Sequence, residues 1–154
     1  MINKILVVDD APVNRSLIKN ILDKALENIT IIEASDGFEA MKKVENEDIT
    51  VIILDIKMPG KDGYEVLKEI KQSKEYKSIP VIMCTALDES ENIEKMLSAG
   101  AMDYFTKPLS KEQIRITLPL KVKNAMEFYQ QKQQLLNYYR RMKEDMKLAQ
   151  VIQM

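Results

Sequence analysis

The sequence contains no histidine, a single cysteine and no long hydrophobic run. Without histidine, the chain lacks the commonest general base, the commonest metal-ligating side chain and the usual phosphohistidine carrier. One cysteine, Cys84, excludes an internal disulfide and fits a reducing compartment. Because no apolar run approaches the roughly 18 residues of a membrane span and the N-terminus lacks a signal-peptide layout, we expect a cytoplasmic protein without membrane contact.

The charge is nearly balanced, with a net charge of -1 over 154 residues. No overall basic field exists that would attract nucleic acid, and Arg140-Arg141 is the only tight basic pair of the C-terminal region. We therefore expect no direct nucleic-acid contact. The length suits one domain of roughly 100 to 150 residues with a few dozen residues to spare.

Short apolar runs alternate with amphipathic stretches along most of the chain. Runs 51–54 and 81–84 are apolar throughout, as strands buried on both faces are. This succession predicts an α/β fold, a doubly wound five-stranded parallel sheet with right-handed crossovers and helices on both faces. The expected strands are 5–8, 30–34, 51–54, 81–84 and 104–106, and the expected helices between them are 13–26, 38–44, 64–72 and 89–98.

Polar side chains stand at the carboxyl ends of four of these strands. Asp9 and Asp10 follow the first strand and Asp55 follows the third. Thr85 follows the fourth strand and Lys107 the fifth. Each residue alone has a structural explanation, such as a helix cap or a solvated loop lysine. Parallel sheets bind ligands at this edge, so the convergence of all five indicates a functional site.

The residue types at this edge favour phosphoryl chemistry. Three carboxylates repel one another unless a cation lies between them, and Mg²⁺ suits carboxylate ligands and accompanies phosphates. Lys107 and Thr85 could then contact phosphoryl oxygens. With no suitably placed histidine, cysteine or serine, Asp55 is the candidate nucleophile and would form an aspartyl phosphate.

This pattern resembles a response-regulator receiver domain of two-component signalling, over about residues 3 to 118. The resemblance implies a flavodoxin-like (βα)5 fold with strand order 2-1-3-4-5, and a signalling switch rather than a conventional enzyme. It places the receiver at residues 1–118 and leaves 119–154 as a helical linker. Besides the strand-end residues, it is carried by Met58-Pro59-Gly60, Asp62-Gly63, Gly100-Ala101 and Lys107-Pro108.

The resemblance implies a metal-assisted phosphoacceptor. Asp55 would accept a phosphoryl group from a phosphohistidine on a sensor histidine kinase or phosphotransfer protein, since this chain has no histidine of its own. Asp10 and Asp55 would ligate Mg²⁺ directly together with the backbone carbonyl of Lys57. Asp9 would hold the ion mainly through water.

The same resemblance implies a switch around the phosphoacceptor. Lys107 would pair with the carboxylate and then with the phosphoryl group, and Thr85 would move toward the new phosphoryl oxygen. Tyr104 would be the aromatic residue that turns inward behind it. Tyr104 is preferred to Phe105 because strand alternation places Phe105 on the face of Lys107, and the family's aromatic switch lies three residues before the lysine.

Two other functions remain open from the sequence. One is a stand-alone receiver that acts only through protein partners, and the other is a Mg²⁺-dependent hydrolase. Haloacid-dehalogenase-like phosphatases also use a strand-end aspartate, but they need a second aspartate two residues later, where this chain has Lys57. A dinucleotide-binding enzyme is disfavoured because Asp-Asp-Ala-Pro replaces the glycine-rich turn after the first strand.

The last region predicts an amphipathic helix. Ser110 with Gln113 resembles a capping box that would open the last receiver helix, and Pro119 would kink or restart it. Beyond Pro119, mostly apolar residues recur at alternating spacings of three and four, typical of a coiled-coil seam. We favour a homodimer through this helix over packing on the receiver itself. The seam comprises Ala125, Phe128, Lys132, Leu135, Tyr139, Met142, Met146, Ala149 and Gln153.

The final residues, 147–153, resemble the linker helix before protein phosphatase 2C-like domains in some response regulators. Natural chains seldom end within a helix, so we expect the regulator to continue beyond residue 154. A serine/threonine phosphatase is the candidate output.

Overall fold

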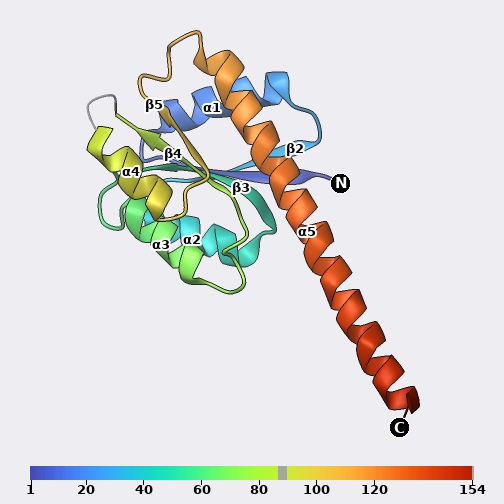
Figure 1. Ribbon diagram of the computed structural model, residues 1–154. Coiled ribbons are helices and arrows are strands. Elements are labelled where there is room, and N and C mark those ends of the chain that lie inside the picture. The colour runs from blue at the N-terminus through green and yellow to red at the C-terminus, as the bar shows by residue number, and fades with distance from the viewer. Residues whose placement is uncertain (87–89, 154) are drawn as a thin grey trace.

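Five parallel strands form one sheet in the order β2-β1-β3-β4-β5 (Figure 1). The structure is a computed structural model that describes residues 1–86 and 90–153. The predicted α/β fold and its strand order are confirmed. The strands are β1 (Asn3–Val8), β2 (Ile29–Ala34), β3 (Ile49–Asp55), β4 (Val81–Thr85) and β5 (Asp103–Thr106), and the helices are α1 (Pro12–Ala25), α2 (Gly37–Asn46), α3 (Gly63–Gln72), α4 (Ser90–Ser98) and α5 (Ile114–Gln153).

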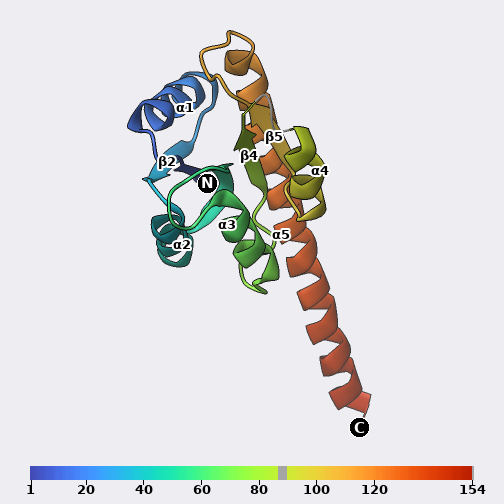
Figure 2. The ribbon, with the colours of Figure 1, turned by 90° about the vertical axis from the view of Figure 1, so that its left-hand side faces the viewer.

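Helices cover both faces of the sheet (Figure 2). Alternate strand residues point to opposite faces, so Leu6 and Val8 of β1 pack toward α2, α3 and α4, whereas Ile5 and Val7 pack toward α1 and α5. Every residue of β3, the central strand, is buried. Continuous apolar sequence in the middle strands is therefore explained by burial on both faces, as predicted.

Two helices on the first face begin with an aspartate cap. Asp36 accepts a hydrogen bond from the Glu39 amide before α2, and Asp62 accepts one from the Glu65 amide before α3. These contacts satisfy N–H groups that have no partner within the helix. The α4 helix was expected to begin at Glu89, which lies outside the described residues.

The predicted start of α5 is wrong. The helix begins at Ile114, so Ser110 lies in a preceding turn and does not cap it. Instead, carbonyls of that turn accept hydrogen bonds from the first helical amides, including those of Ile114 and Arg115. Of the two effects predicted for Pro119, a kink or a restart, the restart is absent, because the helix continues unbroken past this residue. A proline in the second turn removes one hydrogen bond and leaves the later ones intact.

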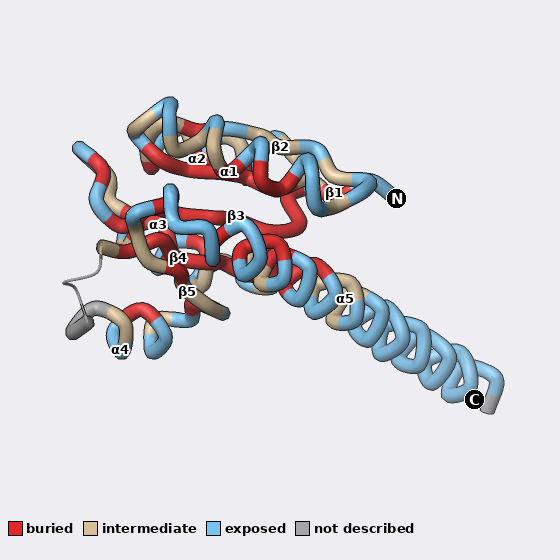
Figure 3. Tube along the Cα trace, turned by 90° about the horizontal axis from the view of Figure 1, so that it is seen from above, coloured by how far each residue is buried: buried red, intermediate tan, exposed pale blue. Residues whose placement is uncertain are grey.

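The α5 helix has a packed part and a projecting part. The packed part is buried against the sheet through Leu118, Val122, Ala125 and Met126. This part of the helix therefore packs on its own receiver, which is the alternative to a coiled coil. Every residue from 134 to 152 is exposed, and this end extends away from the sheet (Figure 3). Among the described residues, no helix combines the length and apolarity that a membrane crossing needs.

Candidate functional site

The sheet places the expected site residues at one edge. Asp55 is the last residue of β3 and pairs in register with Cys84, directly before Thr85 at the end of β4. Asp9 follows β1, and the Lys107 amide after β5 donates to the Thr85 carbonyl at 2.8 Å. Parallel neighbours in register bring these carboxyl ends together, so the predicted convergence has a simple topological cause.

Three carboxylates meet at this edge. Asp9, Asp10 and Asp55 each offer one oxygen, and these oxygens all lie within 4.8 Å of one another. Asp9 is 1% exposed and Asp55 4% exposed, whereas Asp10 is exposed. Such a group of oxygens matches the ligand preference of a hard divalent cation, because the cation removes the mutual repulsion.

Lys107 is the counter-charge to this acidic group. Its Nζ lies 3.1 Å from Asp55 Oδ2 and 3.6 Å from Asp9 Oδ2. Partial burial opposes its charge, but attraction to Asp55 and then to Asp9 raises the pKa of Lys107 above its usual value. A permanent ammonium group therefore borders the carboxylate that was predicted to react.

Asp55 sits in an electrostatically unfavourable position despite Lys107. Burial, and then the charge of Asp9, raise the pKa of the Asp55 carboxyl above its usual value. Attraction to Lys107 offsets only part of this effect. The ionised carboxylate is thus poorly stabilised and can gain energy by bonding to an electrophile or to a cation.

Asp9 is held by hydrogen bonds that the sequence pattern does not predict. Its Oδ1 accepts the Ala11 amide at 2.8 Å and its Oδ2 accepts the Asn14 side-chain amide at 3.2 Å. Arg15 donates to the Asp9 backbone carbonyl at 2.6 Å. Asn14 and Arg15 fall in the first turns of α1, immediately after the aspartate pair, which is the only sequence signal that could have identified them.

The loop after Asp55 is tightly closed. The Gly63 amide donates to the Ile56 carbonyl at 2.8 Å, and a Cβ at Gly63 would lie 2.2 Å from the Asp55 backbone oxygen. Only glycine permits α3 to begin so close to the site. Lys57 lies in this loop and is exposed.

Tyr104 and Phe105 lie on opposite sides of β5. Phe105 is buried on the α1 and α5 face, whereas Tyr104 is half-buried and packs against the cluster on the other face. Thr85 is 2% exposed at the end of β4, beside Thr106 in register. The structure therefore places Thr85 at the site edge and Tyr104 one layer behind it.

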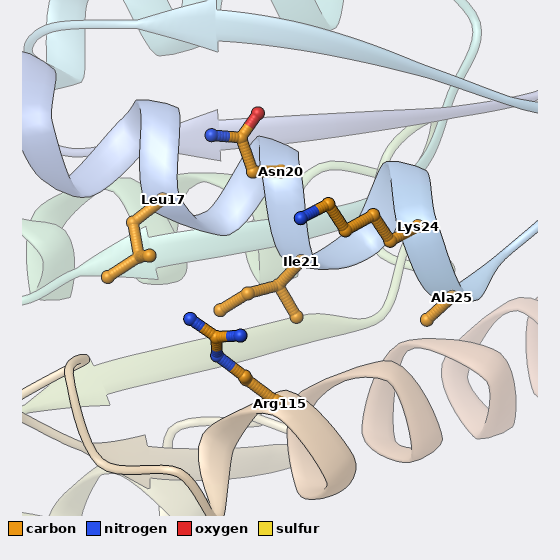
Figure 4. A pocket seen from close by; sticks show the side chains of 6 residues that line it. All are labelled: Leu17, Asn20, Ile21, Lys24, Ala25 and Arg115. Atoms are coloured by element: carbon orange, nitrogen blue, oxygen red, sulfur yellow. The ribbon is translucent and has the colours of Figure 1, made fainter.

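A hollow of about 290 Å³ lies between α1 and α5, away from the carboxylates. Leu17, Ile21 and Ala25 form its apolar side, and Lys24 and Arg115 give it positive charge (Figure 4). Arg115 reaches from α5 toward Leu17 and Ile21 of α1 (Figure 4). Both helices start at the site edge of the sheet, and the groove is lined by the middle and end of α1 and the start of α5.

Comparison with known proteins agrees with this geometry. A family model described as the response regulator receiver domain matches residues 5–118. The chain is 41% identical to the alkaline phosphatase synthesis transcriptional regulatory protein PhoP of Bacillus subtilis over 114 residues, 74% of this chain and 46% of that protein. It is 35% identical to the chemotaxis protein CheY homolog of Campylobacter jejuni over 113 residues, 73% of this chain and 86% of that protein.

Solved structures of response regulators have the same fold. The Mn²⁺-bound form of response regulator Rcp1 superposes with a TM-score of 0.69 at 28% identity, covering 76% of this chain and 89% of that one. The chain spans about half the length of the Bacillus regulator that it matches. The match of the family model and the relatives across the whole sheet shows that the chain belongs to the response regulator receiver domain family.

Proposed function

We propose that this receiver accepts a phosphoryl group on Asp55 from a phosphohistidine of a partner protein, with Mg²⁺ bound at the carboxylate cluster. Receiver domains are signalling switches that interact with histidine kinases or phosphotransfer proteins. One observation carries the assignment to Asp55: of the two buried carboxylates in the cluster, Asp55 lies closer to the Lys107 ammonium, at 3.1 Å against 3.6 Å for Asp9.

The metal assignment rests on the chemistry of the donors. Asp9, Asp10 and Asp55 supply clustered oxygens, and the Mn²⁺-bound form of Rcp1 supports a divalent ion in this fold. Asp10, Asp55 and the Lys57 backbone carbonyl would hold Mg²⁺ directly, with Asp9 acting through water. When bound, Mg²⁺ would neutralise carboxylate charge and attract a phosphoryl oxygen.

The residues then carry out a simple displacement. An Asp55 carboxylate oxygen forms a bond to phosphorus as the P–N bond of the donor breaks, and the departing imidazole takes a proton from solvent. Lys107 and Thr85 hold phosphoryl oxygens during this step. Attack of water on phosphorus later releases phosphate and restores the carboxylate. The chain is thus a phosphoacceptor rather than a conventional enzyme.

The groove between α1 and α5 is the proposed docking surface for the phosphoryl donor. Its apolar side and its two cations suit a helix that presents apolar and acidic side chains. Because α1 and α5 both begin at the sheet edge that carries Asp55, a helix seated along them could bring its histidine to the site.

The output is reached through α5. Tyr104 would turn inward with Thr85 after phosphorylation and alter the packing of β5 against this helix. The related PhoP of Bacillus subtilis is a transcriptional regulator about twice as long as the match. Here the C-terminal resemblance supports control of a serine/threonine phosphatase domain instead.

The projecting part of α5 is proposed to pair with a second copy of the chain. Leu135, Tyr139, Met142 and Met146 are between 42% and 61% exposed along one side of the helix. A single helix of this length gains stability in water mainly by burying such a side. The recurrence of these residues at spacings of three and four matches an identical partner helix.

Phosphorylation can be tested with acetyl phosphate and Mg²⁺ by intact-mass spectrometry. We expect a mass gain of one phosphoryl group that disappears in Asp55→Asn and persists in Asp145→Asn, a matched change in the projecting helix. Multiple turnover of a phosphate ester would instead favour the hydrolase. A wild-type protein that gains no phosphoryl group, while remaining folded, would contradict the proposal.

Light scattering tests self-association. Met142→Glu should convert dimers to monomers, because it places a charge on the proposed contact side. Leu148→Glu is a matched control, since Leu148 is also exposed but lies on the other side of the helix. A monomeric wild-type chain, with and without a phosphoryl mimic, would refute this interface.

A further inference from the structure

Lys121 connects β5 to the packed part of α5. Its Nζ lies 2.8 Å from Asp103 Oδ1 and 5.8 Å from the centre of the Tyr104 ring. The same Asp103 oxygen accepts the Tyr104 amide at 2.8 Å. One ammonium group therefore contacts both the ring of Tyr104 and the carboxylate that fixes the backbone of Tyr104.

The geometry around Tyr104 leaves room for ring movement. The residue lines an open hollow of about 460 Å³ between β5 and α5, which Lys121 also lines. Leu118 and Val122 are buried on the same helix, so the backbone of Lys121 is fixed by packing. The Lys121 ammonium is held by the ion pair with Asp103, and the hollow lies beside the Tyr104 ring.

We infer that Lys121 is a positioning residue that holds the Tyr104 ring in its present half-buried arrangement beside α5 and thereby couples the ring to this helix. The inference rests on the proposed role of Tyr104 as the switch. An ammonium group is attracted to the face of an aromatic ring within about 6 Å, and this attraction ends when the ring turns away. Asp103 keeps the ammonium in place, so the attraction favours one ring position over the other.

This preference changes the ratio of the two arrangements of the Tyr104 ring. A contact made in only one of two arrangements changes their ratio by the free energy of that contact. For a partly exposed cation and ring, the expected change is about two- to fivefold. Lys121→Met should therefore increase the fraction of inward Tyr104 before phosphorylation. It should also lower the beryllofluoride concentration needed for half-saturation by the same factor.

Fluorine NMR of protein labelled with 3-fluorotyrosine measures the ring directly. The Tyr104 resonance is assigned with Tyr104→Phe and followed during titration with beryllofluoride and Mg²⁺. In Lys121→Met, the resonance of the free protein should move toward the bound position, and Lys121→Arg should restore the wild-type position. Lys123→Met removes an exposed charge from a different side of α5. This control should change neither the resonance position nor the half-saturation concentration.

A second comparison separates coupling from a merely structural effect. In a Tyr104→Leu background, Lys121→Met should no longer change the half-saturation concentration, because the ring that Lys121 contacts is gone. An unchanged free resonance and half-saturation concentration in Lys121→Met would overturn the inference, as would an equal effect in the Tyr104→Leu background. Failure of wild-type protein to bind beryllofluoride or to be phosphorylated would refute the proposed function itself.

Discussion

Removal of the exposed carboxylate of the cluster should stabilise the metal-free protein. The change Asp10→Asn keeps the size of the side chain and removes its charge. Asp9 and Asp55 each place a carboxylate oxygen within 4.8 Å of one on Asp10, and Lys107 forms its ion pairs with Asp9 and Asp55. Charges of one sign so close together repel one another when no cation is bound.

The size of this effect follows from the separation of the oxygens. At the upper limit of 4.8 Å, two unit charges repel by about 0.9 kcal/mol at the dielectric of water and about 3.5 kcal/mol at an effective dielectric of 20. Asp10 is exposed, so the lower figure applies to each of its two neighbours. We expect Asp10→Asn to raise the free energy of unfolding by about 1 to 2 kcal/mol.

Urea unfolding in EDTA and in excess Mg²⁺ provides the assay. In EDTA at low salt, the variant should be the more stable protein, and added salt should reduce the difference because exposed charges are screened. A ligand at ten times its Kd adds about 1.4 kcal/mol to a protein that binds it, so Mg²⁺ should stabilise the wild type and barely affect the variant. Asp145→Asn serves as the control for a lost negative charge.

Three results would refute this reasoning. A variant less stable than the wild type in EDTA would mean that Asp10 makes a net favourable interaction in the folded protein. An equal gain from Mg²⁺ in both proteins would mean that Asp10 does not hold the ion. Equal shifts in Asp10→Asn and Asp145→Asn would assign the effect to net charge alone.

Three further predictions concern other positions. Gly63→Ala should lower the free energy of unfolding by at least about 2 kcal/mol and slow phosphorylation, because the added Cβ would lie 2.2 Å from the Asp55 backbone oxygen. Urea unfolding measures the stability and intact mass the phosphorylation. An unchanged stability would contradict the close approach. Burial, with a smaller effect of Lys132, lowers the pKa of Lys71 to about 8. Between about pH 8 and 10.5 the unfolded chain binds more protons at this lysine than the folded protein does, so the contribution of Lys71 to the free energy of unfolding should rise with pH. Urea unfolding of Lys71→Met should no longer show this rise. Burial also raises the pKa of the Cys84 thiol, so a thiol reagent should react slowly until denaturant opens the fold; rapid reaction of the native protein would show an accessible thiolate.

Local patterns identified most of the fold. The run 51–54 predicts a strand buried on both faces, and β3 extends it to Ile49–Asp55 with every residue buried. The start of α5 was mispredicted because Ser110 and Gln113 have the residue types of a capping box, but the turn before Ile114 already supplies acceptors for the first helical amides. Such backbone acceptors depend on the path of the chain and leave no signature in residue types.

The sequence by itself determined the topology and the chemical types at the sheet edge, because hydrophobic periodicity specifies strands and helices and parallel strands bring their carboxyl ends together. Only the tertiary structure decided how those groups meet. It buries Asp9 and Asp55, leaves Asp10 exposed and places Lys107 beside the two buried carboxylates. It also brings Lys121 to Tyr104 across the boundary between β5 and α5. Distances, burial and mutual charge arise from packing between segments far apart in the chain, and the electrostatics of this site depend on those quantities.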